Sequence, residues 1–368
     1  MDYKVGINAL CYSTNRAGIS NYIYNLLQQL SKQSHNVQFT VFLPQSAKKD
    51  YVKFDNCKMV FLPAKNILFR ILLEQLFLPI LFYRFKLDLL HSPGNISPIL
   101  LFKKNIVTIH DIYFRHDKNR FTLFKKVYLY LFTPLTVRFC RSVICVSRYT
   151  YLEILKYYKV DQSKITVIAQ GYSVGSTTST AIKPVFNNSI ISKPFFLFVG
   201  TIEPGKNLVN LIKAFKSFQS QYQLIIAGKF GWKYEVIITA ANEVSVKDAI
   251  IFTGYISDSN LTWLYDNAKA LVFPSIYEGF GLPVIEAMSR GCPVCCSDTS
   301  CLPETAGNAA LYFDPLKPSD INEKMKTVLD PVVRKDLKKK GYLNVKRFSW
   351  EHSASVLLNH YFEVLKNR

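Results

Sequence analysis

Residues 274–293 read PSIYEGFGLPVIEAMSRGCP, and this stretch predicts a strand ending at PS, a glycine-rich turn and then a helix. The helix is expected to begin near Pro283, because proline suits a first helical turn. Free amide groups and a partial positive charge at such a helix start favour binding of a diphosphate. Glu278 precedes the helix and can accept hydrogen bonds from sugar hydroxyls, and Glu286, roughly one turn into it, can accept them from ribose. A lone glutamate on a helix is usually solvated, so the prediction depends on the whole string.

Strand-like runs alternate with helical segments on both sides of a polar stretch, which is typical of parallel α/β sheets. The first series comprises YKVGINAL, VQFTVFL, DLLHS, NIVTIHD and SVICVS. The second comprises FFLFVG, YQLIIAG, AIIFTG, ALVFPS, PVCCSD and AALYF. The stretch between them is rich in Ser, Thr and Asn, which indicates a linker. We therefore expect an α/β protein with two doubly wound domains and a ligand site at the carboxyl ends of the strands.

The length and charge of the chain fit this organisation. Its 368 residues suit two domains better than one. Lys and Arg exceed Asp and Glu by 46 to 26, and residues 1–175 hold 24 basic against 9 acidic side chains, which predicts an anionic partner for the first half. The N-terminus lacks the layout of a secretory signal, and the most apolar segment, 67–85, is interrupted by charges and proline. We expect a cytoplasmic protein, either free or peripheral on the inner face of the cell membrane.

Eight cysteines are present without the spacing of a disulfide framework. Cys292, Cys295, Cys296 and Cys301 could suggest a zinc site on spacing alone. A second pair at the usual ribbon spacing is missing, and PVCCSD has the pattern of a buried strand in which cysteine acts as a small apolar residue. No metal or other cofactor is expected.

Four further segments accompany the first string: VGTIEPGKNLVNLIKAF (199–215), GKFGW (228–232), FTGYISDSNLTWLYDNAKALVFPS (252–275) and SDTSCLPETAGNAALYFDP (297–315). Together they resemble the large retaining glycosyltransferase family 4, whose members have the GT-B fold. The resemblance covers nearly the whole chain. It implies two Rossmann-like domains facing each other across a cleft, with a C-terminal helix packing back toward the N-terminal domain.

The resemblance also implies how the chain is divided. Residues 1–175 would form the acceptor domain and 176–193 the linker. Residues 194–349 would form the nucleotide-sugar donor domain, and 350–368 the returning helix.

The family's donor site can be carried over residue by residue. Lys206 matches the lysine that holds the donor diphosphate, and Gly205 stands where the family often has arginine. The resemblance implies donor contacts from Glu278, Glu286 and the amides of Phe280, Gly281 and Leu282. It also implies that His110, Lys206 and Glu278 take part in catalysis.

Two sites in the first half complete the implied set. Gly18 resembles the glycine of a loop that approaches the donor phosphates. His110 matches a strand-end histidine beside the transferred sugar, with a purely structural histidine as the alternative. Ser147 matches a small polar position in the cleft, but a helix N-cap explains it equally well.

The implied reaction is transfer of a hexose from a nucleotide sugar to a glycan or lipid-linked acceptor in cell-surface polysaccharide biosynthesis. The form of the VGTIEPGKN motif favours GDP-mannose over a UDP-hexose. The departing diphosphate would help deprotonate the acceptor on the same face of the sugar. No Asp-x-Asp motif occurs, so no metal is needed to neutralise the diphosphate.

Other functions compete with this one. A phosphorylase or an epimerase could share the fold, but a phosphorylase needs a cofactor lysine and an epimerase has no need of the Glu278–Glu286 string. A basic, non-enzymatic membrane-binding protein would suit the charge but leave the motifs unexplained. No nucleic-acid-binding motif is present, so nucleic acid is not an expected partner.

The basic first half suggests an anionic membrane as a further partner. Residues 101–141 hold nine basic side chains, among them Lys118, Arg120, Lys125 and Lys126. They are interleaved with the aromatic residues Phe114, Phe121, Phe124, Tyr128, Tyr130 and Phe132. This mixture is expected of a surface helix on lipid, while the alternative is a domain core with solvated cations. The apolar segment 67–85 could line the acceptor cleft.

Overall fold

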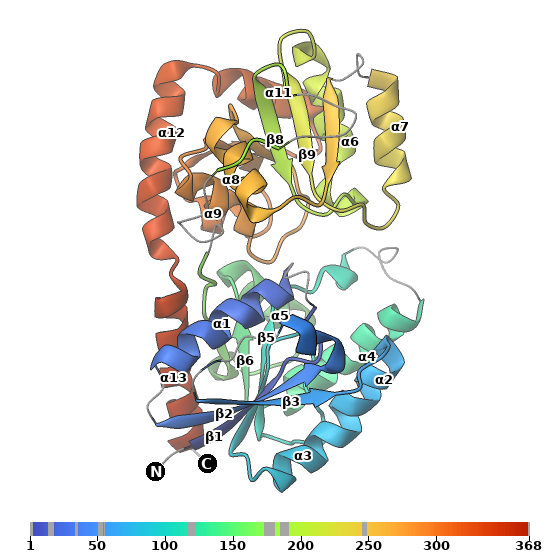
Figure 1. Ribbon diagram of the computed structural model, residues 1–368, viewed down its shortest axis with the longest axis vertical. Helices are drawn as coiled ribbons and strands as arrows, with labels where there is room; N and C mark the ends of the chain where they lie inside the picture. Colours follow the sequence, from blue (N-terminus) through green and yellow to red (C-terminus); the bar gives the residue numbers. More distant parts are fainter. Residues whose placement is uncertain are drawn as a thin grey trace. The chain divides into compact units, whose positions relative to one another are not determined.

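The computed structural model consists of two compact α/β units (Figure 1). Unit 1 comprises Met1–Gly171 with Phe348–Arg368, and unit 2 comprises Tyr172–Arg347. The described residues are 3–13, 18–33, 36–50, 54, 56–116, 123–172, 181–184, 191–244 and 249–366. Most of the linker expected at 176–193 lies outside the described residues.

Unit 1 is built on a parallel seven-stranded sheet with the order β3-β2-β1-β4-β5-β6-β7. Its strands are β1 (Tyr3–Asn8), β2 (Val37–Pro44), β3 (Cys57–Leu62), β4 (Leu89–Ser92), β5 (Asn105–Ile109), β6 (Ser142–Cys145) and β7 (Ile165–Val167). Its main helices are α1 (Ile19–Gln33), α2 (Ile67–Leu72), the π-helical turn η2 (Leu73–Phe77), α3 (Leu78–Arg84), α4 (Leu123–Phe139) and α5 (Arg148–Tyr157). The strand order reverses between β1 and β4, and doubly wound sheets bind ligands at such switch points.

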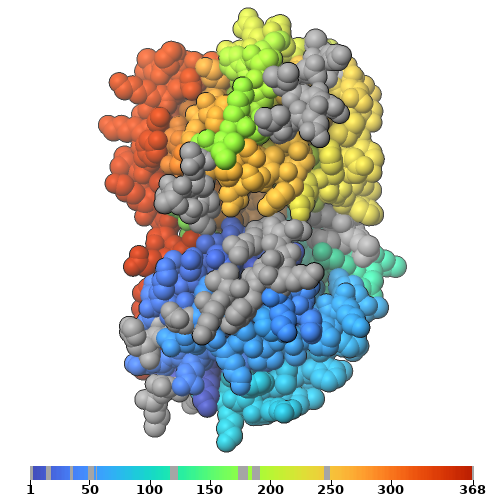
Figure 2. Space-filling model, in the orientation of Figure 1, coloured from blue at the N-terminus to red at the C-terminus, as the bar shows by residue number. Residues whose placement is uncertain are grey.

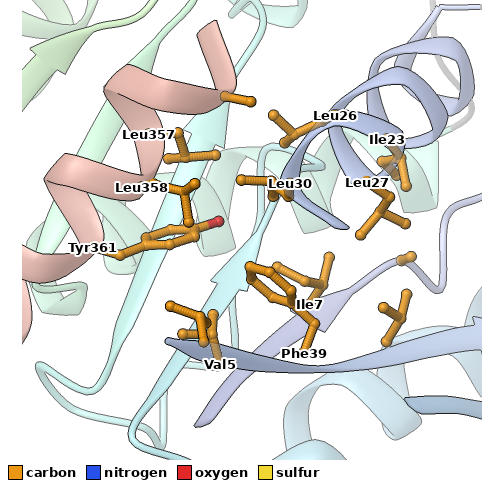
Figure 3. Packing of buried hydrophobic residues seen from close by; sticks show 14 of the residues in the cluster. Val5, Ile7, Ile23, Leu26, Leu27, Leu30, Phe39, Leu357, Leu358 and Tyr361 are labelled. Carbon is orange, nitrogen blue, oxygen red and sulfur yellow. The ribbon is translucent and has the colours of Figure 1, made fainter. Parts of the chain in front are cut away.

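The C-terminal helix α13 (Trp350–Lys366) belongs to unit 1 and covers part of its sheet (Figure 3). Leu357 and Tyr361 of α13 pack with Leu30 of α1 and Ile7 of β1 in one buried cluster. The end of the chain thus completes the core of the domain that its beginning forms.

A buried histidine ties α13 to the sheet. The Nδ1 atom of His91, in β4, lies 2.7 Å from the hydroxyl oxygen of Tyr361, and its Nε2 lies 2.8 Å from the hydroxyl oxygen of Thr108. Burial lowers the pKa of His91 to about 3, so the ring is neutral. Because both ring nitrogens have partners, this polar group is satisfied within the core.

Unit 2 repeats the architecture with a parallel six-stranded sheet of order β10-β9-β8-β11-β12-β13. Its strands are β8 (Phe195–Val199), β9 (Gln223–Ala227), β10 (Ile250–Gly254), β11 (Leu271–Phe273), β12 (Val294–Ser297) and β13 (Ala310–Phe313). Its main helices are α6 (Leu208–Phe215), α7 (Glu235–Val244), α8 (Asp258–Asn267), α9 (Leu282–Ser289), α10 (Leu302–Ala306), α11 (Pro318–Thr327) and α12 (Pro331–Asn344). The switch point of this sheet lies between β8 and β11, where the rings of Phe198 and Phe273 stack with centroids 5.8 Å apart.

The cysteines considered as a zinc site are free and buried: Cys292, Cys295, Cys296 and Cys301. Burial raises the pKa of each thiol, so these side chains pack as neutral apolar groups. Within the described ranges, no three His, Cys, Asp or Glu side chains are grouped so that they could share a metal ion. None of the described helices has the length and apolar character needed to cross a membrane.

Candidate active site

The switch point of unit 2 brings two of the predicted site residues together. Lys206 ends a short helical turn in the loop after β8, and Glu278 lies in the loop after the neighbouring strand β11. The Lys206 ammonium donates a hydrogen bond to the Glu278 carboxylate, and the two form an ion pair. Only 16% and 15% of these two side chains are exposed, so the pair lies largely out of water. Positive and negative groups therefore meet at the edge where this sheet type binds ligands.

Backbone contacts fix the two loops relative to each other. The amide of Ile276 donates to the carbonyl of Gly205 over 3.1 Å, which joins the β11 loop to the β8 loop. The amide of Glu278 donates to the Ser300 hydroxyl, 3.2 Å away, which joins the β11 loop to the loop after β12. Asn207 adopts a left-handed conformation with φ of 56° and starts α6 directly after Lys206. The Lys206–Glu278 pair is thus held from three consecutive strand ends.

The predicted helix start after Glu278 is present as α9. Gly281 precedes it with φ of +88°, and a Cβ there would lie only 2.7 Å from Leu302 Cδ2, so this turn requires glycine. Phe280 is buried, and its carbonyl accepts a hydrogen bond from the Thr305 hydroxyl over 2.6 Å. Leu282 opens the helix, whose first amides have no carbonyl partner within it. Their partial positive charge lies shortly after Glu278 in the chain and favours binding of an anion.

Glu286 lies further along α9, where its side chain is half-buried. The hydroxyl of Tyr265 in α8 donates to Glu286 Oε2 over 3.0 Å. Burial raises the pKa of the Glu286 carboxyl to about 7, and the hydrogen bond from Tyr265 opposes this rise. The carboxyl is therefore close to half-ionised at neutral pH, and a ligand that donates hydrogen bonds to it would complete its ionisation.

In unit 1, His110 follows β5 at the carboxyl edge of the sheet. Its Nε2 lies 2.8 Å from the carbonyl oxygen of Pro93 and must donate, which leaves Nδ1 as the accepting nitrogen. Its amide donates to Asn95 Oδ1 over 2.7 Å, and its carbonyl accepts from the Thr150 hydroxyl over 3.3 Å. Burial lowers the pKa of His110, so the ring is neutral. The amide and carbonyl of His110 are both hydrogen-bonded within unit 1, so any contact of His110 with a ligand would come from its side chain.

Gly18 stands immediately before α1, with φ of +54°. No atom lies within 4 Å of the position that a Cβ would take, so backbone conformation rather than crowding explains the glycine. Ala17 and the three residues before it lie outside the described residues. Ser147 accepts a hydrogen bond from the amide of Thr150 over 3.1 Å and caps α5, as the N-cap interpretation predicted.

Comparison with known proteins assigns this pair of units to a family. The model for glycosyl transferases group 1 matches residues 183–361, and the model for glycosyltransferase family 4 matches residues 16–175. O-antigen chain mannosyltransferase B of Escherichia coli is 30% identical over 284 residues, which cover 74% of this chain and 73% of that protein. The chain belongs to glycosyltransferase family 4. Another family member, O-antigen chain mannosyltransferase RfbU of Salmonella typhimurium, is 34% identical over 218 residues, covering 59% of this chain and 58% of that protein.

Solved structures assign the fold. Sucrose-phosphate synthase from Thermosynechococcus elongatus superposes with a TM-score of 0.78 over the full length of both chains, at 19% identity. WaaG, a glycosyltransferase involved in lipopolysaccharide biosynthesis, superposes with a TM-score of 0.71 over 96% of this chain and 98% of its own, at 12% identity. The family 4 glycosyltransferase described here therefore has the predicted GT-B fold of two Rossmann-like domains.

Three residues that support Glu278 and the helix α9 in this family 4 enzyme were not predicted. Ser300 anchors the Glu278 amide, Tyr265 donates to Glu286, and Thr305 holds the Phe280 carbonyl. Ser300 and Thr305 do lie in the segment 297–315 that resembles the family, so their position was a usable signal. Tyr265 also lies in such a segment, 252–275, but only the packing of α8 against α9 brings it to Glu286.

Proposed function

We propose that this family 4 enzyme is a retaining mannosyltransferase that transfers mannose from GDP-mannose to a growing glycan in cell-surface polysaccharide assembly. The Lys206–Glu278 pair beside the start of α9 is the observation that carries the proposal. Two relatives named as O-antigen mannosyltransferases support mannose as the sugar and a saccharide as the acceptor.

Each group of the unit 2 site has a task that follows from its chemistry. The Lys206 ammonium has three N–H donors, so it can bind a diphosphate oxygen while keeping its bond to Glu278. The amides at Gly281 and Leu282 face the same growing negative charge from the helix start. Glu278 accepts hydrogen bonds from the mannose hydroxyls, and Glu286 accepts them from the ribose of the nucleotide.

We propose that the new glycosidic bond forms on the face from which the diphosphate leaves. The acceptor oxygen attacks the anomeric carbon as the bond to the diphosphate oxygen breaks, and its proton passes to that departing oxygen. The positive charge that develops on the sugar is not opposed by His110, because burial keeps the imidazole neutral. Its Nδ1 can accept a hydrogen bond from a sugar hydroxyl and orient the ring.

The proposed enzyme works without a metal ion. Lys206 and the α9 amides supply positive charge to the diphosphate, and the chain contains no Asp-x-Asp motif to hold a divalent cation. The carbonyl of Gly205 accepts a hydrogen bond from the Ile276 amide, but this residue has no charged side chain. Lys206 therefore contributes more of the positive charge at the diphosphate than it would if arginine stood at position 205.

The proposed acceptor is a lipid-linked saccharide on an anionic membrane. The excess of basic residues in 1–175 supports such a partner, since cations are attracted to anionic lipid. An enzyme that consumes a nucleotide sugar would reach this acceptor from the cytoplasmic face.

A ligand screen followed by a transfer assay tests the proposal. GDP and GDP-mannose should raise the melting temperature of the purified enzyme, because a ligand that binds only the native state stabilises it, whereas UDP, ADP and dTDP sugars should not. Released or transferred mannose should retain the α configuration by NMR. Stabilisation by a UDP sugar alone would contradict the donor, and an inverted product would contradict the mechanism.

A further inference from the structure

Unit 1 exposes an unusual amount of apolar surface on one set of elements. Fifteen of the twenty-seven exposed large apolar side chains among the described residues lie on α2, η2, α3, the loop 98–104 and α4. In the space-filling view, light-blue side chains of α2 and α3 lie open on unit 1 (Figure 2). A typical monomer exposes contiguous apolar patches of only about 300–600 Å². A surface with so many large apolar side chains needs a partner.

The first part of this surface is a helical ridge. The elements α2, η2 and α3 follow one another without a break, and their junction residues Leu72, Leu73 and Leu78 are all right-handed helical. The side chains of the ridge recur every three or four residues, so they lie on one helical face. This apolar ridge consists of Phe69, Leu72, Leu76, Ile80 and Tyr83, each between 43% and 61% exposed.

The opposite face of the same helix is packed into unit 1. Leu73, Leu78 and Phe82 belong to a buried cluster that includes Phe42 of β2 and Leu90 of β4. The helix is therefore apolar both on its inner face, which packs on the sheet, and on its half-exposed outer face, where Lys104 contacts Tyr83. Because the inner face packs against the sheet, the outer face can contact a partner while the helix stays folded on unit 1.

Helix α4 supplies a second apolar stripe. Its exposed side chains Leu123, Val127, Leu131 and Leu135 recur every four residues and so share one face. The ring centroids of Phe102, in the loop 98–104, and Phe139, at the end of α4, are 4.5 Å apart. The loop thus continues the stripe.

Direct contacts join the ridge to the loop. The Lys104 ammonium lies 4.8 Å from the centre of the Tyr83 ring and donates to its hydroxyl over 3.4 Å. The side-chain oxygen of Gln75, in η2, accepts from the amide of Ile99 over 3.1 Å. The ridge, the loop and α4 therefore form one surface of unit 1.

The structure corrects part of the membrane prediction made from residues 101–141. Phe114 and Tyr128, expected to insert into lipid, are buried in unit 1 at 3% and 7% exposure. Lys118 and Arg120 lie outside the described residues, and Lys125 and Lys126 are half-buried. Phe124 on α4 is 47% exposed, so the prediction of a surface-facing ring holds there. The pattern did not reveal that Tyr128 of the same helix packs inward.

The charge on this surface has a single sign. Residues 64–87, 98–104 and 123–141 together contain ten Lys and Arg and one acidic residue, Glu74, which is buried. The exposed cations are Lys65, Arg84, Lys86, Lys103, Lys104 and Arg138. A second copy of the chain docking symmetrically on this surface would set cations against cations. An anionic bilayer complements both the charge and the apolar stripes.

We propose that α2, η2, α3, the loop 98–104 and α4 form an interfacial docking surface for an anionic phospholipid bilayer. The apolar ridge and the α4 stripe enter the boundary between headgroups and acyl chains, and the surrounding cations meet lipid phosphates. This inference rests on the membrane partner proposed above and assigns it to particular residues. Binding through such a surface is reversible and weakens at high salt.

Vesicle co-sedimentation with matched variants tests the surface. Wild-type enzyme should bind phosphatidylcholine vesicles containing about one third phosphatidylglycerol at least roughly tenfold more tightly than pure phosphatidylcholine vesicles at low salt. The triple variant Leu72→Gln, Leu76→Gln, Ile80→Gln should bind at least about tenfold more weakly than wild type. The control Leu316→Gln, Val332→Gln, Leu343→Gln changes three equally exposed apolar residues of unit 2 and should bind as wild type does.

Two readouts separate failure of the surface from failure of the proposed function. Hydrolysis of GDP-mannose without vesicles should be the same in both triple variants and in wild type. Wild-type binding by the ridge variant, or no preference for anionic vesicles, would overturn the docking surface even if hydrolysis is intact. If wild type and the control variant are dimers in sedimentation velocity and the ridge variant is a monomer, the surface would instead be assigned to contact with a second copy. Vesicle binding without hydrolysis of any nucleotide sugar would overturn the function and leave the surface standing.

Discussion

The two units use the same sheet type but place their charges differently. At the switch point of unit 2, Lys206 and Glu278 offset each other in a largely buried pair, and the start of α9 adds positive potential beside them. At the carboxyl edge of unit 1, His110 is neutral, while exposed cations such as Arg84 and Lys103 lie on its helices and loops. The proposed function therefore assigns preorganised charge at the donor to unit 2. It assigns neutral orienting groups and a charged partner surface to unit 1.

Of all the changes considered for the two units, Lys206→Ala should have the largest effect. Loss of one preorganised donor to a developing negative charge slows turnover roughly 100- to 1000-fold. The kcat for mannosyl transfer should fall by that factor, and KM for the donor should change less, because the charge on the leaving group grows in the transition state.

Lys213→Ala provides the matched control for this experiment. Lys213 is an exposed cation of the same unit, on α6, and its loss should leave kcat within about twofold. Equal kinetics for the two variants would show that charge at the switch point of unit 2 has no special role.

A smaller effect, on binding rather than turnover, is expected at Glu286. Glu286→Gln should weaken GDP binding roughly 10- to 100-fold, because the ribose loses a charged hydrogen-bond acceptor. The pKa of Glu286 is about 7 in the free enzyme, and a ribose bound as proposed would favour the ionised carboxyl. Wild-type affinity should therefore fall as the pH drops below 7, by up to about tenfold per unit, whereas the Gln variant should show no such dependence. Calorimetric titrations about one unit above and below this pKa measure both effects.

Stability of unit 1, rather than chemistry, should respond to Tyr361→Phe. The change leaves Nδ1 of buried His91 without its partner and should lower the free energy of unfolding by about 1–3 kcal/mol, measured in urea. Tyr255→Phe, an exposed hydroxyl in unit 2, should change it by less than about 0.5 kcal/mol. Turnover should be unaffected by either, and a loss of kcat in Tyr361→Phe without unfolding would contradict the purely structural role of α13.

The same site gives a pH dependence whose sign is fixed by linkage. The pKa of His91 is lowered from 6.5 to about 3, so the unfolded chain binds more protons than the folded one between these values. The contribution of His91 to stability is therefore complete above 6.5 and is lost as the pH falls toward 3. The slope of unfolding free energy against pH in this range should be shallower in His91→Gln than in wild type.

The sequence predicted the sheets well where strands are buried and strongly patterned. All eleven runs proposed as strands are present, from β1 to β13, but β3 and β7 were missed. The β3 segment Cys57–Leu62 contains the apolar run Met59–Leu62 but is only half-buried at the sheet edge, and β7 (Ile165–Val167) has only three residues. Short edge strands depend on the neighbour that pairs with them, which local sequence does not reveal.

The candidate site of unit 2 was predicted better than the residues that support it or the exposed apolar surface of unit 1. Lys206 and Glu278 each lie in an uninterrupted stretch of motif residues, 199–215 and 274–293, and the strand order brings these stretches together. Tyr265 was missed because its contact with Glu286 is tertiary. The aromatic residues Phe114 and Tyr128 were assigned to the surface because composition reports which side chains occur, not which face of a helix they occupy.

Removal of divalent cations should have the smallest effect on turnover. If Lys206 and the α9 amides supply the positive charge that the diphosphate needs, removing divalent cations should change turnover by less than about twofold. Enzyme treated with EDTA and assayed with a soluble acceptor, away from membranes, measures this directly. Using a soluble acceptor matters, because magnesium also changes the charge of anionic lipid and so affects the docking surface. A large loss of activity that magnesium or manganese restores would mean that the charge of unit 2 is insufficient on its own. The same experiment can then be done on Lys206→Ala. If magnesium partly restores activity in that variant and has no effect on wild type, the cation substitutes for the missing ammonium.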